Sequence, residues 1–216
     1  MGKSALLGLG ALGAGGAGIG SYLAFKPSSS KEEVTTFSQR YKSAILNFKD
    51  NSPDATLWDS KFKTLSGKQP VNQKLKEAAS KISTAEDEAK NLYKQGCEEI
   101  YSHSIKDKTY FNDFKSYCSK TVKEGIKGEW INSSKETADD WKPALTALNT
   151  HDFKTKGSLH KDFEEIKKSL TPTEFTDDQR GKLKTLCDSI GLEIFEEDSV
   201  RVKNAQSFCV KATAAR

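Results

Sequence analysis

The four cysteines of this chain fall into two pairs of nearly equal spacing, and this feature constrains the fold more than any other. Cys97 and Cys118 are 21 residues apart, and Cys187 and Cys209 are 22 residues apart. No CxxC or CxxH spacing occurs, so a zinc site is not expected. The cysteines therefore predict either two disulfides or four buried thiols packed as small apolar residues.

The spacing within each pair fits a helical hairpin, because facing residues of two antiparallel helices lie equally far from the turn. The midpoint of the first pair falls between Asp107 and Lys108, at the end of a polar turn, and that of the second pair falls on Asp198. Four cysteines allow three pairings. In an exported body we expect one disulfide in each hairpin, worth roughly 3 kcal/mol for a loop of about twenty residues.

The order of residues around the cysteines repeats along the chain. Trp58 lies 39 residues before Cys97, and Trp141 lies 46 residues before Cys187. In both stretches an amphipathic helical pattern leads to the first cysteine, and an aromatic residue directly precedes the second. This shared order indicates an internal duplication. It selects the pairing of cysteines within each copy and favours a structural core role for the two tryptophans.

We expect the chain to have four regions. A signal-anchor or transmembrane segment over residues 1–26 precedes a linker, 27–33, and two helical repeat units, 34–125 and 126–216. Beyond the first region, apolar residues recur three and four positions apart, and no stretch alternates with period two long enough to predict a strand. The predicted class is all-α: an N-terminal transmembrane helix followed by a helical bundle of two related units.

Individual helices are predicted from apolar spacing and from capping residues. One helix is expected over residues 34–48, and the next is expected to begin with Ser52 as its cap and Pro53 in its first turn. A single long helix with a heptad-like seam is expected over 71–96, and another over 110–122.

Helices are also predicted in the second repeat unit. Apolar residues at helical spacing occur over 138–148 and 159–170. Thr176 and Gln179 predict a capping box, and Ser199 is expected to precede the last helix.

The N-terminal segment is apolar and rich in glycine. Residues 4–25 carry no charge and stand between Lys3 and Lys26. As a helix they would span about 33 Å, enough for a bilayer core of about 30 Å. An uncleaved signal-anchor and a secretory signal cleaved after Gly20 both fit this pattern. The flanking lysines do not decide the orientation, but the short basic start favours a single-pass membrane protein with an extracellular body.

No constellation of residues points to catalysis, a cofactor or a metal. The histidines, His103, His151 and His160, belong to no ligand or acid–base motif and are expected to be solvated. Without Lys3 and Lys26, the chain has 32 basic and 30 acidic residues, too small an excess for a nucleic-acid surface. We therefore predict no enzymatic activity, no cofactor and no nucleic-acid partner.

Several of these features together resemble the families of uncharacterised paralogous proteins encoded by haemotropic mycoplasmas. They are the glycine-rich start MGKSALLGLGALGAGGAGIGSYLAF, the stretch LWDSKFKTL, the paired cysteine-bearing helices, and a body rich in lysine and poor in arginine. The resemblance implies a small protein tethered to the single cell membrane, surface-exposed and antigenically variable. It implies no catalytic residue.

The sequence thus predicts a membrane-tethered, surface-exposed helical protein with an interaction or antigenic role and no catalysis. Two alternatives stay open. An enzyme on an unfamiliar helical scaffold would bring acids, His103 or His160 together in a pocket. A scaffold on the cytoplasmic side of the membrane would keep four free thiols.

Overall fold

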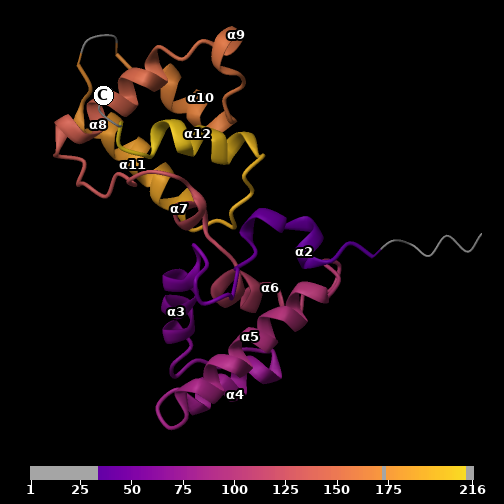
Figure 1. Cartoon of the computed structure of the whole chain (residues 1–216). Helices are drawn as coiled ribbons and strands as arrows, with labels where there is room; N and C mark the ends of the chain where they lie inside the picture. The colour runs from indigo at the N-terminus through magenta and orange to yellow at the C-terminus, as the bar shows by residue number, and fades with distance from the viewer. Residues whose placement is uncertain (1–33, 172–173, 213–216) are drawn as a thin grey trace, which may run out of the picture. The chain divides into compact units, whose positions relative to one another are not determined.

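The computed structural model describes residues 34–171 and 174–212 (Figure 1). The chain divides into two units, Met1–Val34 and Thr35–Arg216, and nearly all of the described residues belong to the second. Within the described ranges every regular element is helical, and β-pairing is confined to isolated bridges. The predicted all-α class is confirmed for this part of the chain.

Short connections join the helices, which include one 3₁₀ segment (η1) and one π-helical segment (η2). Their bounds, in chain order, are α2 (Phe37–Arg40), η1 (Lys42–Ala44), α3 (Ala55–Thr64), α4 (Gln73–Lys81), α5 (Glu86–Ser102), α6 (Phe111–Asp113), η2 (Phe114–Cys118), α7 (Val122–Gly125), α8 (Ala138–Asn149), α9 (Phe153–Lys156), α10 (Lys161–Lys168), α11 (Asp177–Gly191) and α12 (Val200–Phe208).

No helix within the described ranges is long and apolar enough to cross a membrane. The predicted transmembrane segment, residues 4–25, and the linker, 27–33, lie outside the described residues. The membrane tether therefore stays a prediction from the sequence.

Buried side chains form two hydrophobic clusters, here called the first and the second core. The first core is built by elements from α2 to η2 and includes Trp58, Phe62 and Tyr93. The second core is built mainly by α7, α8, α10, α11 and α12 and includes Trp141 and Phe163. Trp58 is 7% exposed and Trp141 is fully buried. The predicted core role of both tryptophans is confirmed.

The predicted single helix over 71–96 is wrong, because the chain reverses after α4 and returns as α5. Ala85, which precedes α5, leaves the helical conformation. The two helices run antiparallel (Figure 1), and an ion pair joins Lys74 to Glu99 across them. One apolar seam therefore belongs to two helices that pack against each other, and this is why a single heptad-like pattern runs through both.

Gly96 permits α5 to pack closely on α4. A Cβ placed on Gly96 would lie 2.9 Å from the side chains of both Asn72 and Leu75. Leu75 is fully buried, so it has little room to move aside. Any side chain at position 96 would force the two helices apart.

Gly96→Ala should therefore destabilise the protein. Overpacking a core contact costs about 1–3 kcal/mol, which outweighs the gain of about 1 kcal/mol from the helix propensity of alanine. Gly181→Ala in α11 is the matched control, because a Cβ there meets only the Lys135 side chain, at 3.4 Å. Urea unfolding should show a loss of stability for the first variant and none for the second. Equal effects would contradict the close packing at Gly96.

Residues 34–48 do not form the predicted single helix. Thr36 begins α2 with a capping box closed by Gln39, and the helix ends after one turn. After η1, Ile45 pairs with Ser119 in an isolated β-bridge. The backbone here bonds to a segment that is distant in sequence, and local periodicity does not reveal such a partner.

Two other predicted boundaries are wrong. Ser52 does not cap a helix, because its hydroxyl donates to the carbonyl of Asn47 and α3 begins after Asp54. The predicted helix over 110–122 is interrupted, since η2 ends the helical run and Val122 begins the separate helix α7.

The boundaries marked by capping side chains within residues 126–216 are confirmed. Thr176 and Gln179 form the predicted capping box of α11. Ser199 accepts a hydrogen bond from the amide of Val202 at the start of α12. Helices α8 and α10 also lie where the apolar spacing predicts them.

Candidate functional site

Both predicted disulfides are present, and they use every cysteine of the chain. Cys97 and Cys118 are joined at 2.01 Å between sulfurs, with 5.3 Å between their Cα atoms. Cys187 and Cys209 are joined at 1.98 Å, with 5.5 Å between Cα atoms. All four residues are fully buried. The pairing inferred from spacing is confirmed, and the alternative of four buried thiols is wrong.

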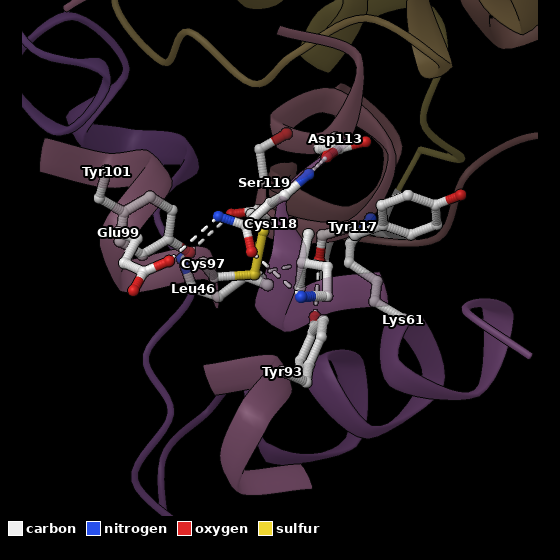
Figure 2. Close-up of a disulfide and its surroundings, with 12 residues drawn as sticks. Leu46, Lys61, Tyr93, Cys97, Glu99, Tyr101, Asp113, Tyr117, Cys118 and Ser119 are labelled. Carbon is white, nitrogen blue, oxygen red and sulfur yellow. Dashed lines mark hydrogen bonds between the residues drawn. A yellow bond between two sulfur atoms is a disulfide. The ribbon is translucent and has the colours of Figure 1, made fainter. Parts of the chain in front are cut away.

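Two tyrosines of α5 surround the first disulfide (Figure 2). The hydroxyl of Tyr93 donates to the carbonyl of Tyr117, and the hydroxyl of Tyr101 donates to the carbonyl of Cys118, both at 2.6 Å. Tyr101 also accepts a hydrogen bond from the amide of Leu46 at 3.3 Å. Burial raises the pKa of both phenols, so they remain neutral donors at physiological pH.

In both disulfides, the sulfur of the first cysteine lies close to the carbonyl oxygen of the aromatic residue that precedes the second cysteine. The sulfur of Cys187 lies 3.8 Å from the carbonyl oxygen of Phe208. In the first hairpin the sulfur of Cys97 lies 4.0 Å from the carbonyl oxygen of Tyr117. The repeated aromatic–cysteine sequence therefore corresponds to a repeated geometry.

The residues after Cys118 close the first core by pairing with an extended segment. Ser119 forms an antiparallel bridge with Ile45. The amide of Lys120 donates to the carbonyl of Ala44 at 2.8 Å. The disulfide therefore fixes Cys118 directly before Ser119, the residue whose bridge to Ile45 closes the first core.

The residues after Cys209 close the second core in the same manner. Val210 forms an antiparallel bridge with Trp130. The amide of Lys211 donates to the carbonyl of Glu129 at 2.7 Å. In both cores, the residue directly after the second cysteine makes the bridge, and the next amide makes the hydrogen bond.

A second bridge lies near the start of each core. Thr36 pairs with Ser104, and Thr121 pairs with Ile194. Each of these threonines also begins a short helix, α2 or α7, with a capping box. The beginning of each core is thereby attached to the turn that follows its first cysteine.

Residues 119–122 take part both in the bridge that closes the first core and in the bridge that begins the second. Ser119 pairs with Ile45, which packs against the first core. The amide of Lys120 donates to the carbonyl of Ala44 and its carbonyl accepts from the amide of Phe195, at 3.0 Å, and both of these partners belong to the second core. The same short segment therefore ends the first core and begins the second. Cys118 stands directly before it.

Ion pairs add further links between the two cores. Lys61 of α3 is 6% exposed and pairs with Glu124 of α7 at 2.9 Å. Arg40 pairs with Glu196. A charge as buried as that of Lys61 requires a partner, because an unpaired buried charge is strongly destabilising.

Asp113 fixes the segment that leads into α4. It is 4% exposed, and its Oδ2 accepts hydrogen bonds from the amides of Val71 and Asn72 at 2.8 and 2.7 Å. Burial raises the pKa of this carboxyl, although the two amides act in the opposite direction. The raised pKa means that the folded protein holds this proton more tightly than the unfolded chain does.

This raised pKa predicts how Asp113→Asn changes stability with pH. The asparagine keeps an acceptor oxygen for both amides but carries no charge. As pH rises through about 4, the unfolded carboxyl ionises first, so the wild type should lose stability relative to the variant until the native carboxyl has also ionised. Urea unfolding at several pH values measures this difference. A wild type that gains relative stability with rising pH would contradict it.

The histidines differ in their surroundings. His151 is 7% exposed, so its expected solvation is wrong. Its Nε2 lies 2.9 Å from the carbonyl oxygen of Gly157, and its ring contacts that of Phe208. The ring of His103 contacts Tyr110. These contacts give both rings a structural role.

His160 lies beside an ion-pair cluster formed by residues of α10 and α12 and of the segment that follows α11. Its Nδ1 is 3.1 Å from the guanidinium of Arg201, which also binds Asp162 and Glu193. The bond from Arg201 lowers the pKa of Asp162. Within the described ranges, no group of three or more histidine, cysteine and acidic side chains could hold a metal ion.

An open groove of about 820 Å³ lies between α10 and α11. Ile166 and Leu186 supply apolar surface, and charged side chains, including Asp162, Glu165 and Arg201, line the rest. This groove was not predictable from the sequence, because its residues come from α10, α11, α12 and the segment before α8 and carry no motif.

Comparison with known proteins identifies no relative: no protein-family model matches the chain, and neither a curated protein nor a solved structure shows a significant match. The function is therefore inferred from the chemistry of the residues described above.

Proposed function

We propose that this chain is an exported helical protein that acts by binding and is held at the outer face of a membrane by its N-terminal segment. The observation that carries the proposal is the pair of disulfides, which are fully buried and use all four cysteines. Disulfides persist in oxidising surroundings and are rare in the cytosol. Their presence supports a body outside the cytoplasm.

The proposed tether is the uncharged segment over residues 4–25. Its length suits a bilayer core, and a body delivered through it would reach the compartment in which the disulfides form. The resemblance to the paralogous proteins of haemotropic mycoplasmas supports surface display and an antigenic role.

We also propose that the two cores arose by internal duplication of a unit, predicted over residues 34–125 and 126–216. Because Thr121 and α7 belong to the second core, the second copy begins before Thr121 and not at residue 126. Support comes from geometry as well as from residue order. Each core has one buried disulfide, a closing bridge one residue after it, and a threonine that both bridges and caps. A duplicated scaffold can present two related surfaces, of which either one is free to diverge.

Binding rather than catalysis is supported by the way titratable groups are used. The ring of His151 is packed inside the second core. Arg201 is engaged by Asp162 and Glu193. An activated nucleophile would need a neighbouring base held within hydrogen-bond distance, whereas these groups hold the fold together.

Labelling and disulfide mapping in the cells that produce the protein test the proposal. A membrane-impermeant amine reagent added to intact cells should modify exposed lysines of the body, such as Lys63 and Lys182, because their side chains are more than half exposed. Peptide mapping without reduction should recover the two predicted disulfides.

A cytosolic enzyme of the same cells is the control, and it should be labelled only after lysis. If the body were also labelled only after lysis and all four cysteines were alkylated without reduction, the protein would be a scaffold on the cytoplasmic side. Either result would overturn the proposed export.

A further inference from the structure

The residue directly before the first cysteine differs between the two hairpins and changes how the helices pack. In α5 it is Gly96, whose lack of a side chain lets Leu75 of α4 approach. In α11 it is Leu186, whose side chain lines the groove between α10 and α11. The α4–α5 pair is therefore closely packed at this position, whereas an open groove of about 820 Å³ lies between α10 and α11.

The groove combines apolar surface with charged side chains. Leu186 of α11 is half-buried, and Ile166 of α10 belongs to the second core and reaches the groove with 8% of its surface exposed. Most of its charges are already neutralised, since Asp162 pairs with Arg201 and Asp178 pairs with Lys182 at 2.7 Å.

Glu165 is the exception among the acidic side chains of the groove. It lies next to Ile166 on α10, it is exposed, and it has no ion-pair partner among the described residues. An unpaired carboxylate beside an aliphatic surface is complementary to a cation carried beside an aliphatic side chain.

The walls of the groove also restrict the conformation of an occupant. Both walls are helices, and the backbone groups in their interiors are already hydrogen-bonded within each helix. An extended peptide would find no strand edge to pair with and would depend on water for its backbone hydrogen bonds, so the groove favours a segment that satisfies its own backbone groups. A helix does so, and α10, about 12 Å long at 1.5 Å per residue, can contact roughly two of its turns.

We propose that this groove binds a helical segment of a partner protein that presents a leucine-like side chain to Ile166 and Leu186, with a lysine or arginine one turn away facing Glu165. The inference rests on the proposed binding function and names its partner chemistry. It does not depend on export, so the two proposals fail separately.

The test uses the full-length, oxidised protein and two synthetic peptides of about three helical turns. The first is built from alanine, leucine and lysine, with the leucines on one face. The second has glutamate in place of every lysine. Each carries a fluorescent label for anisotropy and a photo-crosslinking residue, so that the site of contact can be mapped by mass spectrometry.

The lysine peptide should bind at least tenfold more tightly than the glutamate peptide and crosslink to α10 and α11. Glu165→Lys should weaken its binding at least tenfold. Glu164→Lys is the matched control: it makes the same charge change on the same helix, outside the groove lining, and should weaken binding less than twofold.

An equal loss of peptide affinity in the two variants would show a general attraction between the positive peptide and the negative charges of α10, and it would overturn the proposal. So would equal affinity for the two peptides, crosslinks confined to other helices, or no binding of the lysine peptide at about 100 µM. Because both substituted glutamates lie on the surface of α10 and neither is buried, circular dichroism should show the same fold for both variants.

Discussion

Each core depends on a buried disulfide that lies one residue before a closing β-bridge. The disulfide fixes the position of the second cysteine against a long helix, and the next residue then pairs with an extended segment from the beginning of the core. A loop of about twenty residues closed by a disulfide contributes roughly 3 kcal/mol in the chain-entropy model. This is a large share of the total stability of a small domain.

The connection between the cores gives the first disulfide a wider role than the second. Residues 119–122 close the first core through the bridge of Ser119 with Ile45 and begin the second through Val122, whose amide donates to the carbonyl of Glu193 at 2.8 Å. The buried pair of Lys61 and Glu124 reinforces this junction. The open groove lies between α10 and α11 of the second core.

Features that depend on short-range chemistry or on symmetry of spacing were predictable from sequence. The disulfide pairing follows from equal distances to a turn, the burial of Trp58 and Trp141 follows from their repeated position ahead of the cysteines, and the cap at Thr176 follows from local hydrogen bonding. Each of these features can be recognised from the spacing of residues along the chain or from the residues of a single helical turn.

Features that depend on contacts between distant segments were not predictable in the same way. Residues 34–48 have helical spacing, yet Ile45 is held by a bridge to Ser119. His151 has a polar sequence environment but packs against Phe208. Gly96 and Leu186 occupy matching places before a cysteine, and only the packing of α4 and α10 shows what the difference does.

Amide hydrogen exchange in two cysteine variants tests most directly whether the segment after Cys118 couples the two cores. Replacing Cys97 and Cys118 with serine should speed exchange at least tenfold at Lys120 and also at Val122. Replacing Cys187 and Cys209 should speed exchange at Lys211 and leave Lys120 protected.

That asymmetry is expected because the segment after Cys118 bonds to both cores, whereas the described contacts of the segment after Cys209 are with the second. If loss of the first disulfide left Val122 protected, or if loss of the second exposed Lys120 equally, the shared segment would not couple the two cores and the account would be wrong.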